Sequence, residues 1–192
     1  MKDLLLRQVQ VVDPSGPHHD AQVDVLVRNG RFERIGQRVP KGEATEVHAK
    51  GLHVSPGWVD LCAHFRDPGD EQKEDLVSGS DAAAAGGFTA VAVLPSTHPP
   101  VDSRAGIEYM LRRTQAHAVR VLPLGALTRG MKGEQLAETF DMQQAGALAF
   151  TDDRSPIRNT RLMMLALQYT KGFGGTVVAF PNDPDLAAGG QM

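Results

Sequence analysis

The sequence predicts an α/β protein in which a small β-rich module, residues 1–55, precedes a larger region, residues 56–192, where strands and helices alternate. Before Pro56, apolar side chains recur at every second residue, which is typical of half-buried strands. After Pro56, apolar runs of strand length are separated by stretches with helical spacing. A chain of 192 residues is long enough for one sizeable core and a small appendage.

The β-rich module is predicted to contain a hairpin. Alternating residues of AQVDVLVRNGRFERIG flank Asn29-Gly30, a pair that favours a two-residue turn with positive φ. The segments LLLRQVQVVD and TEVHAKGLHV lie on either side and are expected to add further strands. We therefore expect residues 1–55 to form a unit of their own.

The larger region is predicted to contain five strands and four helices. The last helix has Leu162, Leu165, Ala166 and Tyr169 on one face, which we expect to be buried. The first helix is expected to end at Gly86-Gly87, because glycine tolerates a left-handed exit. The predicted strands are residues 58–64, 88–95, 119–126, 147–153 and 176–180, and the predicted helices are residues 74–85, 102–118, 133–146 and 160–172.

Successive strand–helix units with apolar strands indicate a parallel sheet covered by helices. Two closures fit this pattern, an open doubly wound sheet and the first part of an eight-stranded barrel. The first strand is followed by no glycine-rich phosphate loop, which weakens the nucleotide-binding version of the open sheet. A complete barrel takes about 250 residues, so a barrel would reach its fifth strand here.

The composition excludes several classes of partner. The chain has 20 basic and 23 acidic residues and no long run of one sign, so we expect no nucleic-acid or membrane-surface binding. Its single cysteine excludes an internal disulfide and is compatible with a reducing compartment. No apolar run is long enough for a signal peptide or a bilayer span, so a cytoplasmic location is the expectation.

Residues able to do chemistry gather at the predicted strand ends. His64 ends the first strand, Ser96 follows the second, Asp152 and Asp153 end the fourth, and Phe180 ends the fifth. Taken singly, such residues often have structural roles, such as capping a helix. In both closures, however, functional groups collect at the carboxyl ends of strands, so their clustering is the functional signal.

Three blocks of the sequence resemble successive blocks of the dihydroorotase family, within the metal-dependent amidohydrolase superfamily. They are VSPGWVDLCAHFRDPG, KEDLVSGSDAAAAGGFTAVAVLPSTHP and AGALAFTDD. The resemblance implies a sandwich-like β module followed by the first five strand–helix units of a (β/α)8 TIM-type barrel. It also implies the interconversion of carbamoyl aspartate and dihydroorotate in pyrimidine biosynthesis, with zinc lowering the pKa of water and polarising the carbonyl.

The resemblance carries over only part of the family's metal site. The His-x-His pair of the first strand falls on Cys62 and His64, and the bridging aspartate falls on Asp153. The histidine expected at the end of the fifth strand falls on Phe180, whose ring cannot bind a metal. Cys62 has two interpretations, a thiolate ligand or a small buried residue of the core. With His64 and Asp153 as the matched donors, we expect zinc binding to be weak or absent.

The positions that bind the substrate in the family match this sequence better than the metal-ligand positions do. The arginine that grips the substrate carboxylate falls on Arg66, whose planar guanidinium suits bidentate binding. The asparagine that assists it falls on Ser96, which is shorter and lacks the amide donors. The catalytic base of the family is expected beyond Met192.

Three functional interpretations follow from this partial match. The protein is a noncatalytic dihydroorotase-like scaffold, an active zinc-dependent dihydroorotase with an altered metal site, or a piece of a longer chain. The changed ligand positions favour the scaffold, for which the resemblance implies aspartate transcarbamoylase as a partner. If the protein is active, its substrate is dihydroorotate or carbamoyl aspartate. Unpaired outer strands also predict an oligomer.

Overall fold

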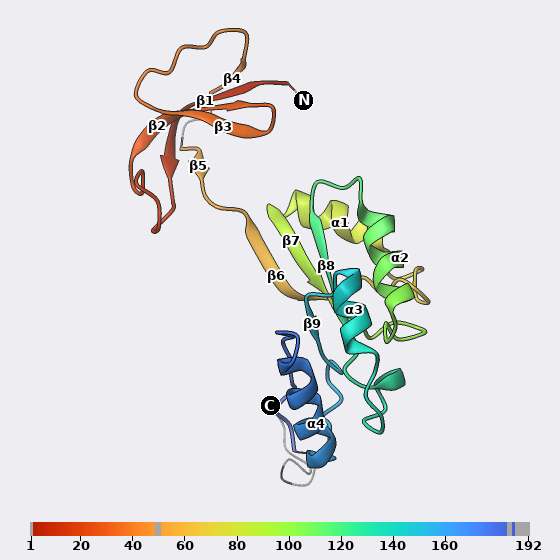
Figure 1. Cartoon of the computed structure of the whole chain (residues 1–192). Helices are drawn as coiled ribbons and strands as arrows, with labels where there is room; N and C mark the ends of the chain where they lie inside the picture. Colours follow the sequence, from red (N-terminus) through yellow and green to blue (C-terminus); the bar gives the residue numbers. More distant parts are fainter. Residues whose placement is uncertain (1, 49–50, 184–185, 187–192) are drawn as a thin grey trace. The chain divides into compact units, whose positions relative to one another are not determined.

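The structure is a computed structural model that describes residues 2–48, 51–183 and 186 (Figure 1). The chain divides into two compact units, Met1–Pro56 and Gly57–Met192. The first unit contains β strands, and the second alternates strands with helices. The predicted α/β class is confirmed.

Unit 1 is a small sheet built around a central hairpin. Its strands are β1 (Leu4–Val11), β2 (Gln22–Arg28), β3 (Arg31–Gly36), β4 (Thr45–Val47) and β5 (His53–Val54), in the order β3-β2-β1-β4 with β5 also paired to β1. The predicted hairpin is confirmed, because β2 and β3 pair antiparallel around Asn29 and Gly30. Both turn residues have positive φ, 50° and 74°, as a two-residue turn of this kind requires.

A polar network ties three strands of unit 1 together. The Arg7 guanidinium on β1 donates to Asp24 of β2 at 2.7 Å, and its Nε donates to Glu46 of β4 at 2.9 Å. Asp24 is 5% exposed and also accepts hydrogen bonds from the backbone N–H groups of Gln8 and Val39. The buried carboxylate of Asp24 is therefore matched by donors from several segments of the module.

Unit 2 contains a parallel sheet whose strands follow chain order, β6-β7-β8-β9. Helices α1, α2 and α3 lie along one side of this sheet (Figure 1). The strands are β6 (Trp58–Ala63), β7 (Phe88–Val93), β8 (Arg120–Gly125) and β9 (Ala149–Phe150); the helices are α1 (Leu76–Ala85), α2 (Arg104–Thr114), α3 (Thr139–Ala145) and α4 (Thr160–Lys171), with a 3₁₀ turn at Arg129–Met131.

Helices α1 and α4 begin where a polar side chain accepts hydrogen bonds from the first backbone N–H groups. Asp75 accepts hydrogen bonds from the N–H groups of Val77 and Ser78 at the start of α1, which forms a capping box. Asn159 caps α4 through the N–H of Leu162. Gly87, with φ of 83°, provides the left-handed exit predicted after α1.

The main core lies between the sheet and its helices. Strand residues such as Val91, Val93 and Phe150 pack there against Ile107 and Met142 from the helices. The alternate strand residues form a smaller apolar cluster, Ala92, Leu94, Leu124 and Ala149. Because successive side chains of a strand point to opposite faces, the sheet is apolar on both sides, as a helix-covered parallel sheet of a barrel requires.

The fifth predicted strand, residues 176–180, is wrong as a full strand. Only one parallel bridge forms there, between Val177 and Phe150, with hydrogen bonds from the N–H of Phe150 to Thr176 and from the N–H of Val178 to Phe150. The neighbouring strand β9 is two residues long, so it offers the next segment a single pairing position. The chain follows the direction of the sheet at this point without extending the ladder.

Two helix predictions also need correction. In α4 the buried residues are Leu162, Ala166 and Thr170, whereas Leu165 is 44% and Tyr169 is 50% exposed. The buried stripe of α4 is therefore narrower than predicted, with one residue every four positions. Helix α3 begins at Thr139 instead of residue 133, because the segment before it forms an isolated β bridge through Leu136.

Candidate functional site

The end of β6 places its residues on two faces. Ala63 and Phe65 are buried in the core on the helix side. His64 lies between these two buried residues and faces away from that core. The register of β6 against β7 shifts between Asp60 and Ala63, so the alternation of the strand does not assign a face to Cys62. Close packing of α1 depends on the same segment, because a Cβ added at Gly79 would lie 2.6 Å from the ring of Phe65.

Three of the predicted site residues meet at the carboxyl ends of the strands. Ser96, after β7, donates a hydrogen bond from Oγ to Oδ2 of Asp153 at 2.8 Å, and its Oγ lies 3.3 Å from Nδ1 of His64. His64 Nε2 also lies 3.5 Å from Oδ2 of Asp153. The side chains of His64 and Asp153 are 30% and 15% exposed, so the cluster can still be reached by solvent. We call His64, Ser96 and Asp153 the rim cluster.

The two adjacent aspartates after β9, Asp152 and Asp153, have different roles. Asp152 is 4% exposed, and its Oδ1 accepts hydrogen bonds from the backbone N–H groups of Leu127 and Thr128, each at 2.9 Å. Its Oδ2 accepts from the Thr128 hydroxyl. Burial raises the pKa of Asp152, and the hydrogen bonds from Thr128 and Leu127 oppose that rise. Asp152 therefore fixes the loop after β8, while Asp153 belongs to the rim cluster.

Asp153 reaches the rim through an uncommon backbone conformation. Its φ is 51°, in the left-handed region, and its N–H donates to Thr151 Oγ1 at 3.0 Å. Non-glycine residues with positive φ are uncommon, and such residues cluster at functional sites. The turn separates the directions of the two carboxylates.

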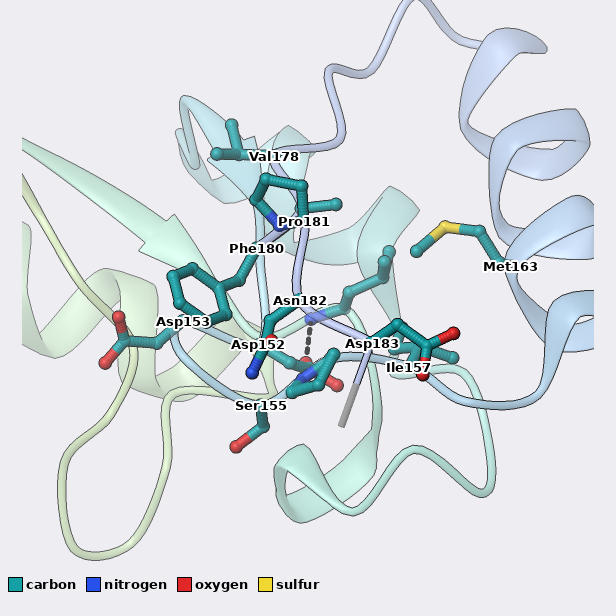
Figure 2. A pocket seen from close by; sticks show the side chains of 13 residues that line it. Asp152, Asp153, Ser155, Ile157, Met163, Val178, Phe180, Pro181, Asn182 and Asp183 are labelled. Atoms are coloured by element: carbon teal, nitrogen blue, oxygen red, sulfur yellow. Dashed lines mark hydrogen bonds between the residues drawn. The ribbon is translucent and has the colours of Figure 1, made fainter. Parts of the chain in front are cut away.

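A pocket of about 310 Å³ opens beside Asp153. Phe180 and Asp153 lie toward one end of it and Met163 of α4 lies at the other (Figure 2). Its lining is mixed, with Ile157 among the apolar residues and Ser155 among the polar ones. Phe180 thus contributes an aromatic wall where the resemblance implies a histidine ligand.

The donors in the described part of the chain do not fit a zinc ion. Zinc sites use three or four protein donors, and no group of three or more His, Cys, Asp or Glu residues within residues 2–48, 51–183 and 186 is arranged to hold a metal. His64 and Asp153 make one pair. Cys62 is exposed, so the interpretation of it as a buried core residue is wrong. It lies on β6, the outer strand of the described sheet, where neighbouring residues are exposed too.

Arg66 lies in the loop after β6, apart from the rim cluster's hydrogen bonds. It is exposed, its φ is 58°, and its guanidinium has no hydrogen bond or ion pair to any residue that the structure describes. The next residue, Asp67, is 1% exposed and accepts a hydrogen bond from the hydroxyl of Tyr109 at 2.7 Å. The sequence interpretation missed Asp67 and Tyr109, although an aspartate directly after an exposed arginine and before a proline was a signal for a structured loop.

The described residues include no helix long and apolar enough to cross a membrane.

Comparisons with known proteins identify relatives over almost the whole chain. A family model described as dihydro-orotase-like matches residues 51–192. A dihydroorotase of Geobacter metallireducens is 43% identical over 192 residues, which are 99% of this chain and 45% of that protein. A dihydroorotase of Aquifex aeolicus is 38% identical over 190 residues, 98% of this chain and 45% of that protein. The chain thus spans less than half the length of these curated relatives.

Solved structures show the fold. An L-hydantoinase from Arthrobacter aurescens has a TM-score of 0.67 at 20% identity, covering 92% of this chain and 40% of that chain. A crystal structure of a dihydroorotase has a TM-score of 0.64 at 12% identity, covering 92% of this chain and 50% of that chain. The predicted architecture, a β module followed by the first strand–helix units of an amidohydrolase-type barrel, is confirmed with the correction at residues 176–180.

Proposed function

Because the chain belongs to the dihydroorotase-like family, we propose that it is a protein of pyrimidine biosynthesis with an impaired metal site, and that it acts as a noncatalytic partner of another enzyme. Aspartate transcarbamoylase is the proposed partner. In this proposal the protein binds a small carboxylate of the pathway, dihydroorotate or carbamoyl aspartate, without turning it over. The proposal rests on the residues at the rim.

One observation carries the proposal. Oδ2 of Asp153, the oxygen nearest to His64, already accepts a hydrogen bond from Ser96. The rim cluster is thus a self-contained polar contact among protein groups, whereas a zinc site needs several donors aimed at one empty point. Phe180 adds an aromatic ring to the same region, which supplies no donor and occupies space.

The proposed binding role uses Arg66. A guanidinium forms two parallel hydrogen bonds with a carboxylate, and such pairs are stronger and more specific than neutral hydrogen bonds. Arg66 is exposed and free of partners within the described part of the chain, so it is open to a ligand. Ser96 offers a hydroxyl in the rim cluster, although its hydrogen bond already goes to Asp153.

A second candidate function, an active zinc-dependent dihydroorotase with an altered site, has specific support. His64 Nε2 and Asp153 Oδ2 lie 3.5 Å apart, and Cys62, two residues before His64, is exposed. Identity of 43% to a curated dihydroorotase is also high. This function requires Cys62 to act as a ligand together with donors from outside the described residues.

Zinc analysis separates the two candidates. After dialysis against buffer, the purified protein is expected to retain far less than one zinc per chain by elemental analysis, since His64 and Asp153 are too few donors. Cys62→Ala should leave that value unchanged. Retention of about one zinc per chain, lost in Cys62→Ala, would establish Cys62 as a ligand and favour the active enzyme.

A further inference from the structure

The loop that carries Arg66, residues 66–70, has a tightly specified backbone. Arg66 and Gly69 have φ of 58° and 106°, both in the left-handed region. The N–H of Asp70 donates to the carbonyl of Arg66 at 2.9 Å, which closes the loop on itself. A Cβ at Gly69 would lie 2.1 Å from the carbonyl oxygen of His98, so glycine is required there for space as well as for φ.

Asp67 anchors this loop to two helices. It is 1% exposed, and its Oδ1 accepts a hydrogen bond from the Tyr109 hydroxyl of α2 at 2.7 Å. Its Oδ2 accepts from the backbone N–H of Leu76, at the start of α1, at 3.3 Å. The hydrogen bond to Asp67 and burial both raise the pKa of Tyr109, so its phenol keeps the proton to a higher pH than an unperturbed tyrosine does. A buried carboxylate without such donors would be strongly unfavourable.

A third contact fixes the loop from the side of β7. The backbone N–H of His98 donates to the carbonyl of Pro68 at 2.9 Å. The loop is thus held by α1, α2 and the segment after β7, while Arg66 at its start is left exposed. Asp67, which these contacts hold in place, directly follows the exposed Arg66 in the sequence. Any shift of Asp67 therefore moves the Cα of Arg66.

We propose that Tyr109 and Asp67 are positioning residues that hold Arg66 in the orientation in which it binds a carboxylate ligand. This inference rests on the proposed function, in which Arg66 binds dihydroorotate or carbamoyl aspartate. Tyr109 acts from α2 and is not itself a ligand-binding residue. Removal of its hydroxyl frees the loop and lowers affinity only through Arg66.

The test is a double-mutant cycle on carbamoyl aspartate binding, measured by isothermal titration calorimetry. Tyr109→Phe is expected to raise Kd roughly five- to tenfold, the scale of one lost hydrogen bond. Arg66→Gln should weaken binding more, and adding Tyr109→Phe to Arg66→Gln should cause no further loss. Tyr169→Phe is the matched control, because the chain has two tyrosines and Tyr169 lies on α4. It should leave Kd unchanged.

Each outcome of the cycle decides one claim. A Tyr109→Phe effect of the same size in the Arg66→Gln background would mean a general structural role and would overturn the inference. An unchanged Kd in Tyr109→Phe would overturn it as well, while the proposed binding role stands. Failure of the unaltered protein to bind carbamoyl aspartate would overturn the binding role and, with it, the inference. Hydrogen exchange at residues 66–70 should rise in Tyr109→Phe and stay unchanged in Tyr169→Phe.

Discussion

At the scale of single residues, Asp152 and Asp153 show how adjacent carboxylates acquire different roles. Asp152 accepts hydrogen bonds from two backbone N–H groups and one hydroxyl, and is almost fully buried. Asp153 is turned by its positive φ to the rim, where Ser96 and His64 contact it. The sequence gives no sign of which is which, because the difference depends on the loop after β8.

This division predicts unequal effects on stability. Asp152→Ala leaves the buried N–H groups of Leu127 and Thr128 without their acceptor and should lower the free energy of unfolding by about 2–4 kcal/mol. Asp153→Ala removes contacts that are partly exposed, so it should lower the free energy of unfolding by less than half of that amount. Urea denaturation measures both. Equal losses in the two variants would contradict the separate roles.

The metal-ligand positions give a second prediction at this scale. Cys62→His combined with Phe180→His restores two histidines of the family pattern and should raise zinc retention after dialysis above that of the unaltered protein. The matched control is Cys62→Ala combined with Phe180→Ala, which opens the same space without adding donors. If the alanine pair retained as much zinc as the histidine pair, the account of the lost ligands would be wrong.

At the scale of elements, the Arg7 network joins β1, β2 and β4 of unit 1. The hydrogen bond from Arg7 is the main cause that lowers the pKa of Glu46. For Asp24, burial opposes the change, but hydrogen bonds from Gln8, Arg7 and Val39 together lower its pKa. Both carboxylates are thus stabilised in their charged form in the folded module.

The sign of these shifts sets the pH dependence. A carboxylate whose pKa is lowered on folding stabilises the fold above its unfolded pKa, about 4, and that contribution is lost as pH falls through the folded pKa. Unit 1 should therefore lose stability below about pH 4. The protection factors of the Val23 and Val25 amides, measured by hydrogen exchange as a function of pH, report this loss. Asp24→Asn should make these protection factors fall less steeply at low pH. A curve as steep in Asp24→Asn as in the unaltered protein would exclude Asp24 as its source.

Local sequence signals predicted the elements well where the determining contacts are local. The Asn29-Gly30 turn and the glycine exit after the first helix of the larger region depend on neighbouring residues, and both agree with the structure. The predictions failed where contacts with residues distant in the sequence determine whether a side chain is buried. Tyr169 has the spacing of a buried stripe, but it packs edge-on against Phe173 with 50% of its surface exposed.

The same distinction applies to the candidate site. The period of two and the strand ends were sufficient to place His64, Ser96 and Asp153 together, because parallel strands deliver their carboxyl ends to one edge. The contact of Asp67 with Tyr109 joins residues 42 positions apart in the chain, so no local pattern reveals it. Exposure of Cys62 likewise depends on its place on an outer strand of the described sheet.

At the scale of the whole molecule, β6 exposes a row of large apolar side chains. Trp58, Val59 and Leu61 are 64%, 52% and 65% exposed on the outer strand of the described sheet. Exposed apolar outer strands pair with other chains. We expect this chain to self-associate in sedimentation velocity at micromolar concentration, and Leu61→Lys to reduce the association. A monodisperse monomer at every concentration would contradict this expectation.

The proposed role also predicts a partner. Mixed with aspartate transcarbamoylase of the same organism, the protein should co-elute with it in size-exclusion chromatography, because a noncatalytic member of the pathway acts through another enzyme. The variant Arg66→Gln should co-elute equally well, since Arg66 is assigned to ligand binding. Separate elution at all concentrations tested would remove the scaffold role.

The most direct test of the central claim is the turnover of dihydroorotate by the unaltered protein, followed by absorbance with and without a metal chelator. The rim cluster supplies two metal donors, and its Asp153 oxygen is held by Ser96, so hydrolysis should not exceed the rate without protein. The chelator should then have no effect. Dihydroorotate hydrolysis that is clearly above background and disappears with chelator would contradict the noncatalytic account and establish the protein as an active metal-dependent dihydroorotase.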